Sequence, residues 1–342
     1  MKRKLLIRVD ANNTIGYGHY FRCLAIALVI SDSWDITFAV SEPTRFLVDN
    51  IKLYKFKYIL VGKYDYTDPD SKGYADEIQF DLEPFLEDDF HSVLVDGYFF
   101  GPKYFEKLAS YSVRVIVISD SVNVPIKAHI LINSSPQITS EAYAEFDVET
   151  LALGPAYSML RPEFYTKRFR QRQKLDSKKL LISFGGADHF GLTERIVEMC
   201  IKSGRFEEIN LILKIGEISD YLEEILRVNA HVIPHGNLSA NEVINIMNNC
   251  NMAILPSSGI LYESMACELP TIICWYALNQ KPLHDYLVNE HDVPTLGFVK
   301  NGTSMEELLS CIESISEYNP KVYGEMKHEM QQAPQRYAQL FA

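Results

Sequence analysis

Residues 5–30 read LLIRVDANNTIGYGHYFRCLAIALVI and contain the pattern of one complete structural unit. The apolar run Leu5–Val9 predicts a strand, and Tyr20–Ile30 predicts a helix. The polar loop between them holds Gly16 and Gly18, and glycine lets the backbone adopt positive φ and approach a ligand closely. The stretch therefore predicts a strand, a ligand-facing loop and a helix in immediate succession.

The same alternation recurs along the whole chain. The predicted strands are continuous apolar runs, which is typical of strands buried on both faces of a parallel sheet covered by helices. Alternating strands and helices imply right-handed βαβ units. The further strand candidates are Ile36–Val40, Tyr58–Val61, Ser92–Val95, Val113–Ile118, Leu180–Phe184, Ile209–Ile215, Met252–Leu255 and Thr271–Cys274. The further helix candidates are Leu192–Lys202, Ala240–Asn248, Ile260–Cys267, Met305–Ser316 and Pro320–Leu340.

A basic stretch divides the chain into two halves. With 342 residues, two domains are expected at roughly 100–200 residues per domain. We expect an N-terminal domain over 1–160, a linker over 161–179 and a C-terminal domain over 180–342, whose last helix packs back on the first domain. The linker is favoured as a solvated segment, with a nucleic-acid patch as the alternative. The fold class predicted is α/β, with two Rossmann-like domains facing across a cleft and ligand bound at the carboxyl ends of the strands.

Composition narrows the function classes. The formal net charge of −12 disfavours general nucleic-acid binding. No apolar run approaches the roughly 18 residues of a membrane helix, and the apolar run near the N-terminus is too short for a signal peptide. The six cysteines form no CxxC pair and no zinc-like spacing with histidine, which favours reduced, buried thiols. We expect a cytoplasmic monomer that binds neither nucleic acid nor membranes.

The first candidate site lies in the loop and helix start from Asp10 to Arg22. His19 follows Gly18 in the first helical turn, where the positive end of the helix dipole favours a neutral imidazole that can take a proton. The loop has neither the GxGxxG spacing nor the lysine of a P-loop. The residues alone leave two interpretations equally open, because His19 can also act only as a cap or packing residue.

Two further loops offer anion-binding geometry. SFGGAD at 183–188 brings Gly185 and Gly186 to a strand end, although a tight turn without ligand is equally compatible. Residues 256–279 place hydroxyls and backbone N–H groups at a helix start, which suits a pyrophosphate. The residues concerned are Ser257, Ser258 and Gly259, followed by Glu263, which can accept both hydroxyls of a ribose or simply favour the helix start, and by Asn279.

Other polar side chains also follow predicted strands. Asp96, Tyr98 and Asp120 stand at strand ends, where each can be a site residue, a turn residue or an N-cap. Asp65, Asp68 and Asp70 share one loop, which we interpret as solvated and acidic. Since no cluster with metal-ligand spacing occurs in the sequence, we expect no metal and no cofactor.

A longer motif connects these residues to a known family. The pattern R-x-D-x-x-x-x-I-G-x-G-H-x-x-R is formed by Arg8, Asp10, Ile15, Gly16, Gly18, His19 and Arg22. Further matching stretches are VDGY at 95–98, GPAYSMLRPEFY at 154–165, SFGGAD at 183–188 and SSGILYESMACELPTI at 257–272. In these motifs the chain resembles the UDP-2,4-diacetamido-2,4,6-trideoxy-β-L-altropyranose hydrolases of pseudaminic acid biosynthesis. That family is related to spore coat polysaccharide protein G and to glycosyltransferase family 28. The chain departs from its shortest members by extra sequence around 63–89.

The resemblance implies a GT-B fold and assigns roles to single residues. His19 would be the general base, and Glu263 would hold the uridine ribose. The loops with Gly185 and Gly186 and with Ser257, Ser258 and Gly259 would frame the diphosphate. Tyr98 and Asn279 would face the sugar, with Asp10, Gly16, Gly18 and Arg22 also on the substrate side.

The reaction implied is metal-independent hydrolysis at the anomeric carbon. Its products would be UDP and free 2,4-diacetamido-2,4,6-trideoxy-L-altrose. The main alternative is a UDP-sugar-dependent glycosyltransferase of the same fold. A non-catalytic binder of nucleotide sugars is a third class, against which an intact His19 argues.

Overall fold

The chain divides into two compact units, the first made of Met1–Arg161 with Gln332–Ala342 and the second of Pro162–Gln331. The structure is a computed structural model. It describes residues 2–12, 15–62, 80–86, 90–120, 122, 124–166, 178–185, 191–213, 218–317 and 321–342. Asp65, Asp68, Asp70, Gly186 and most of the basic linker lie outside these ranges.

The first unit is built on a parallel sheet of seven strands within the described ranges, in the order β3-β2-β1-β4-β5-β6-β7. Val9 at the end of β1 pairs with Asp96 at the end of β4, so these two strands finish side by side. The strands are β1 (Arg3–Val9), β2 (Trp34–Val40), β3 (Lys57–Leu60), β4 (Ser92–Asp96), β5 (Arg114–Ile118), β6 (Lys127–Asn133) and β7 (Asp147–Leu153).

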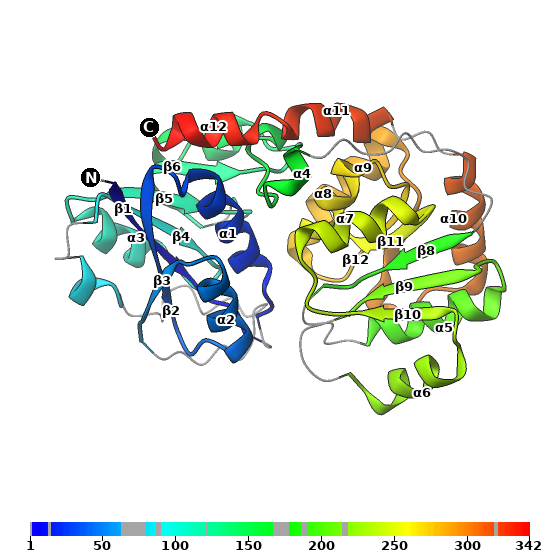
Figure 1. The fold of residues 1–342 in the computed structure, drawn as a ribbon. Coiled ribbons are helices and arrows are strands. Elements are labelled where there is room, and N and C mark those ends of the chain that lie inside the picture. Colours follow the sequence, from blue (N-terminus) through cyan, green and yellow to red (C-terminus); the bar gives the residue numbers. More distant parts are fainter. Residues whose placement is uncertain are drawn as a thin grey trace. The chain divides into compact units, whose positions relative to one another are not determined.

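Helices cover this sheet, with α1 and α2 on one side and α3 on the other (Figure 1). The last helix, α12, returns to the first unit. Its Tyr337 hydroxyl donates to the Tyr157 carbonyl at 2.6 Å, and the Trp34 indole donates to the Phe341 carbonyl at 3.2 Å. The helices of this unit are α1 (Gly18–Ile30), α2 (Arg45–Leu53), α3 (Pro102–Ala109) and α12 (Ala333–Leu340), with short 3-10 turns at Glu83–Phe85, Ser140–Tyr143 and Pro155–Tyr157.

The second unit repeats the plan with a parallel sheet of six strands within the described ranges, in the order β10-β9-β8-β11-β12-β13. Its strands are β8 (Lys179–Ile182), β9 (Glu208–Ile212), β10 (Val232–His235), β11 (Met252–Pro256), β12 (Thr271–Trp275) and β13 (Thr295–Phe298). Its helices are α4 (Glu163–Thr166), α5 (Leu192–Ser203), α6 (Asp220–Val228), α7 (Ala240–Asn249), α8 (Gly259–Ala266), α9 (Lys281–His291), α10 (Met305–Glu317) and α11 (Lys321–Met330), with 3-10 turns at Leu278–Gln280 and Val299–Asn301.

In each sheet the first strand in the chain is an inner one. The next two strands are added on one side of it, and all later strands are added on its other side. The strand order therefore reverses between β1 and β4 in the first unit and between β8 and β11 in the second. Ligands of open α/β sheets bind beyond the carboxyl ends of the strands at such a reversal point. The fold thus predicts one ligand-binding edge in each unit, beyond the strand ends at this reversal point.

The predicted α/β class with two Rossmann-like units is confirmed. Strands β6, β7, β10 and β13 were not predicted, nor were helices α2, α3, α4, α6 and α9. In β7 the exposed polar residues Asp147, Glu149 and Thr150 interrupt the apolar pattern, since β7 is an edge strand. The single helix predicted over 320–340 is wrong: residues 321–340 form two helices, because Pro334 near the start of α12 cannot continue a preceding helix.

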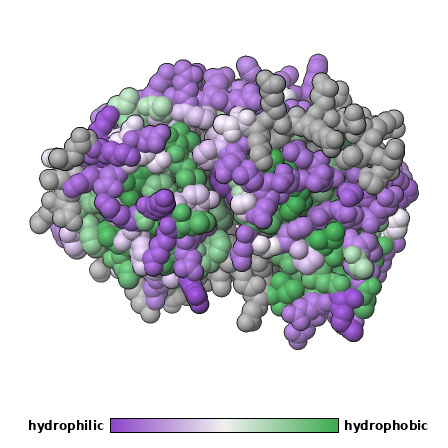
Figure 2. All heavy atoms as spheres, viewed as in Figure 1, coloured by the Kyte–Doolittle hydropathy of each residue, from purple (hydrophilic) through white to green (hydrophobic). Residues whose placement is uncertain are grey.

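Apolar residues fill the two cores, and the surface is mostly polar. All six cysteines are buried and free, as expected. On the face shown in Figure 2, hydrophilic residues cover most of the surface and hydrophobic residues show between them. Within the described ranges, no helix is long and apolar enough to span a bilayer.

Candidate functional site

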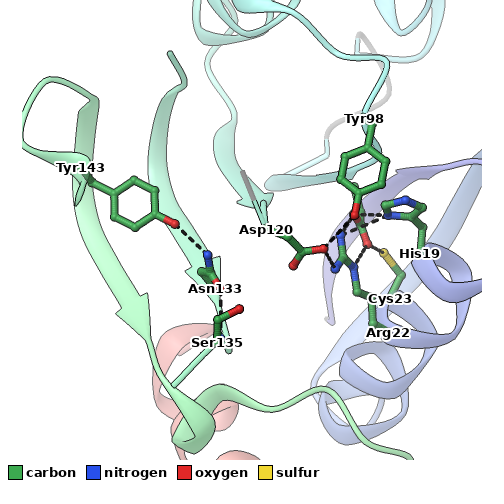
Figure 3. Close-up of polar contacts among 9 residues, drawn as sticks. His19, Arg22, Cys23, Tyr98, Asp120, Asn133, Ser135 and Tyr143 are labelled. Atoms are coloured by element: carbon green, nitrogen blue, oxygen red, sulfur yellow. Dashed lines mark hydrogen bonds and ion pairs between the residues drawn. The ribbon is translucent and has the colours of Figure 1, made fainter. Parts of the chain in front are cut away.

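Asp96 organises the ligand-binding edge of the first unit. It is the last residue of β4, and its side chain is fully buried. Arg22 binds it through two parallel hydrogen bonds, Nε to Oδ2 and Nη2 to Oδ1, both 2.6 Å long. The Nδ1 atom of His19 lies 2.8 Å from Oδ1, and the Cys23 thiol donates to Oδ2 at 3.5 Å (Figure 3). One carboxylate therefore fixes three side chains of the first turns of α1.

The electrostatics of this cluster keep Asp96 charged. Burial alone would raise the pKa of Asp96, but the Arg22 guanidinium and His19 outweigh burial and lower that pKa to about 2. Burial likewise acts to lower the pKa of Arg22, yet Asp120 and Asp96 hold it well above its ordinary value. Burial and the neighbouring Asp96 raise the pKa of the Cys23 thiol, so this cysteine stays protonated.

The contacts of His19 assign its tautomer. Oδ1 of Asp96 is an acceptor, so the short contact places a hydrogen on Nδ1. Arg22 Nη2 also lies 3.1 Å from Nδ1, but a lone pair on Nδ1 would leave two acceptor atoms, Nδ1 and Oδ1, facing each other at 2.8 Å. In the neutral imidazole, Nε2 then carries the lone pair, and this nitrogen has no hydrogen-bond partner in the part of the chain that the structure describes. Since the side chain is 12% exposed, this nitrogen can take a proton from a small reactant.

Two groups from neighbouring strand ends complete the cluster. Asp120, beyond β5, accepts from Arg22 Nη1 at 2.6 Å and from the Tyr98 hydroxyl at 3.0 Å, both through Oδ2. The Tyr98 ring stands edge-on to the His19 imidazole, with ring centres 4.7 Å apart. Tyr98, which was predicted separately from His19 and Arg22, therefore lies in one cluster with them.

The other residues predicted in the Asp10–Arg22 loop fix the conformation of this loop. Asp10 is buried, pairs with Arg8 at 2.7 Å and accepts from the Ser41 amide at 2.7 Å, so it ties the loop to the ends of β1 and β2. Gly16 has a φ of 79°, which favours glycine, and its N–H donates to the Asn12 carbonyl at 2.9 Å. Gly18 begins α1, and a side chain there would meet nothing within 4 Å.

The ligand-binding edge of the second unit carries hydroxyl and amide groups. Ser257 follows β11 and is 3% exposed, and its buried Oγ has no hydrogen-bond partner among the described residues. The amides of Ser257 and Ser258 were expected to face a ligand, but they donate to the Cys274 and Pro256 carbonyls, both at 2.8 Å. The turn into α8 uses these two donors. Within the described ranges, the N–H groups that remain at the helix start are those of Gly259 and Ile260.

The remaining predicted residues of this unit lie at the same edge. Gly185 follows β8 with a φ of 82°, beside the hydroxyl of Tyr276. Glu263 is half-buried one turn into α8, and Asn279 is exposed in the turn after β12. The neighbouring Gln280 is buried, and its Oε1 accepts from the Tyr276 amide at 3.0 Å, so it shapes this turn.

Asp96 and Asp120 are the residues whose role in the cluster the sequence left undecided. Asp96 ends an apolar strand, and Asp120 lies two residues after the end of the next strand. An acidic residue at the end of an apolar run is a signal that the sequence itself shows. Their pairing with Arg22 depends on the order in which β1, β4 and β5 lie in the sheet, which the sequence does not show. Within the described ranges, no group of three or more His, Cys, Asp or Glu side chains is placed to hold a metal ion.

Stability should depend on pH through Asp96. Its pKa is about 2 in the folded chain against an ordinary 3.8, so its ionisation stabilises the fold above about pH 4, and this contribution is lost as the pH falls through about 2. We expect the Asp96→Asn variant to be less stable at pH 7, and the gap in unfolding free energy to shrink by about 2 kcal/mol on acidification to pH 2.

Urea unfolding followed through Trp34, in a Trp275→Phe background, measures this gap for the first unit. Asp147→Asn is the matched control, because Asp147 is an exposed residue paired with Lys127 at 3.0 Å. A gap that does not change with pH would show that Asp96 is not held ionised by its neighbours.

Comparisons with known proteins agree with this architecture. No family model matches the chain. An uncharacterised protein of Methanocaldococcus jannaschii is 26% identical over 227 residues, which span 58% of this chain and only 45% of that protein. The UDP-2,4-diacetamido-2,4,6-trideoxy-β-L-altropyranose hydrolase of Campylobacter jejuni is 24% identical over 299 residues, covering 84% of this chain and 97% of the hydrolase.

Solved structures show the fold. MurG of Acinetobacter baumannii superposes with a TM-score of 0.62 at 11% identity, covering 98% of both chains. Arabidopsis thaliana UGT89C1, solved with UDP, gives a TM-score of 0.64 at 12% identity, covering 99% of this chain and 98% of that one. The chain thus has the GT-B fold of these glycosyltransferases, and in sequence it is similar to the Campylobacter hydrolase over most of its length.

Proposed function

We propose that the chain is a metal-independent hydrolase that cleaves a UDP-linked 2,4-diacetamido-2,4,6-trideoxy sugar at its anomeric carbon. The observation that carries this proposal is the His19–Asp96 pair at the reversal point of the first sheet. A carboxylate that orients a histidine and leaves its second nitrogen unoccupied is the arrangement of a general base. The similarity to the Campylobacter hydrolase supports the choice of substrate.

His19 supplies the proton transfer in this reaction. Nε2 takes a proton from water while the water oxygen forms a bond to the anomeric carbon, and the bond from that carbon to the β-phosphate oxygen breaks. UDP leaves with the electron pair, and the proton on His19 is later released to solvent. Asp96 stays ionised and stabilises the imidazolium. Proton transfer of this kind contributes about 10²–10⁴-fold in rate.

The second unit is proposed to bind the nucleotide. The Ser257 hydroxyl, unpartnered within the described ranges, and the N–H groups at the start of α8 are donors suited to a diphosphate. Such donors also stabilise the charge that develops on UDP as it leaves, so the reaction needs no strong general acid. Glu263, one turn further along α8, is proposed to accept the ribose hydroxyls. In the transition state, positive charge develops on the reacting sugar ring, as in an oxocarbenium ion.

A glycosyltransferase on the same fold is the competing function. In that case His19 would deprotonate a hydroxyl of an acceptor rather than water, with the same Asp96 contact. Hydrolysis is preferred because the relative that matches 84% of the chain is named as a hydrolase, whereas the transferases share only 11–12% identity with it in MurG and UGT89C1.

Replacing His19 tests the proposed function directly. The His19→Asn variant should fold and bind UDP almost as the wild type does, while turnover of the UDP-diacetamido-trideoxy sugar falls by at least about 10²-fold, since the base is lost. Release of UDP is measured by chromatography. His328→Asn, an exposed position in α11, is the matched control. Undiminished turnover in His19→Asn would remove His19 from the reaction and contradict the proposal.

Replacing Glu263 tests the nucleotide site. A carboxylate that holds ribose hydroxyls is worth about 1.5–3 kcal/mol, so Glu263→Ala should weaken UDP binding roughly 10–150-fold. Calorimetric titration of UDP measures the change, and Glu290→Ala, exposed in α9, is the control. Equal affinity in wild type and Glu263→Ala would mean that this residue only favours the start of the helix.

A further inference from the structure

Asp120 has one carboxylate oxygen that the cluster around Asp96 does not use. Its Oδ2 accepts both hydrogen bonds of the side chain, from Arg22 at 2.6 Å and from Tyr98 at 3.0 Å. Oδ1 has no partner among the described residues. Figure 3 shows this second oxygen turned away from Tyr98 and joined to none of the side chains drawn.

Exposure distinguishes Asp120 from the other carboxylate of the cluster. The side chain of Asp96 is 0% exposed, and both of its oxygens are bound by protein groups, whereas Asp120 is 23% exposed. Asp96 therefore has no oxygen left for a ligand. Asp120 is held by two donors on one oxygen, and its partly exposed side chain is bound to Arg22 and Tyr98, both of which contact His19.

We propose that Asp120 is a sugar-binding residue whose Oδ1 accepts a hydrogen bond from a hydroxyl or acetamido N–H of the substrate. The proposal rests on the proposed function and adds to it a residue that fixes the sugar next to the base. An ionised carboxylate offers acceptors only, so its partner on the substrate must be a donor. The two donors on Oδ2 lock the orientation of the carboxylate, which makes the position of Oδ1 specific.

This arrangement predicts selectivity for the sugar. A site built to receive a hydroxyl or an N–H strongly rejects an analogue that lacks it, because the carboxylate oxygen is then left without its hydrogen bond. UDP lacks the diacetamido-trideoxy sugar, so the affinity of the chain for UDP should not depend on Asp120. The contrast between the nucleotide sugar and UDP separates a sugar contact from a general structural effect.

The Asp120→Asn variant tests the proposal by calorimetry, in a His19→Asn background so that the nucleotide sugar is not consumed. Arg22 and Tyr98 both donate, so the amide oxygen will take the place of Oδ2 and the NH2 group that of Oδ1, where it meets the donor of the substrate. We expect the UDP-diacetamido-trideoxy sugar to bind about 10–100-fold more weakly and UDP to bind within about twofold of its former affinity. Asp147→Asn, at an exposed aspartate of the same unit, should change neither.

Two results would overturn the proposal: unchanged affinity for the nucleotide sugar, or an equal loss for the sugar and for UDP. Circular dichroism checks folding, and Asp120→Glu, which keeps the charge and displaces Oδ1, replaces the asparagine variant if that variant does not fold. A chain that binds the sugar through Asp120 but does not hydrolyse it would contradict the proposed function alone.

Substrate analogues that each lack one hydroxyl or acetamido N–H identify the donor that Asp120 binds. The analogue without that donor should bind the His19→Asn chain more weakly than the full nucleotide sugar does. Adding Asp120→Asn should then weaken its binding no further, because the hydrogen bond is already lost, and a double-mutant cycle measures this coupling. Equal further weakening for every analogue would contradict a specific contact at Oδ1.

Discussion

The buried carboxylate of Asp96 is the constraint on which the site depends. A charge without exposure to water is tolerated only where it is fully paired, and here Arg22 and His19 provide the pairing from one helix. Because β4 lies next to β1, the carboxylate meets the first turns of the helix that follows β1. The position of His19, its tautomer and the orientation of Arg22 toward Asp120 all follow from this contact.

The two units apply one topology to two kinds of chemistry. In the first, the reversal point gathers ionisable groups, which suits proton transfer and the binding of a polar sugar. In the second, the equivalent point carries a buried hydroxyl and the N–H groups of a helix start, which suits an anion. This division suits the proposed hydrolysis of a nucleotide sugar, in which one part of the substrate reacts and another must be held as it becomes a leaving group.

Much of this architecture was predictable from the sequence because its strands are continuous apolar runs. The sequence predicted the strand at Leu5–Val9, the glycine loop and the helix α1. It also indicated His19 as a candidate site residue. Short edge strands such as β10, which contains Pro234, carry too few apolar residues to stand out. The role of Asp96 could not be predicted, since it lies 74 residues from Arg22 in the chain and meets it only through the order of the strands. The use of the Ser257 and Ser258 amides within the turn was likewise unpredictable, because it depends on the path of one short segment.

The proposed reaction requires that water attack the anomeric carbon of a UDP-linked sugar without any acceptor. The most direct test is to incubate the chain with the UDP-diacetamido-trideoxy sugar in oxygen-18 water and to measure the mass of the released UDP by mass spectrometry. The result is clear because phosphate oxygens do not exchange with water. We expect UDP to be released without oxygen-18, since the bond that breaks joins the sugar carbon to the phosphate oxygen. Oxygen-18 in UDP, or no release of UDP until an acceptor is added, would contradict the proposed reaction.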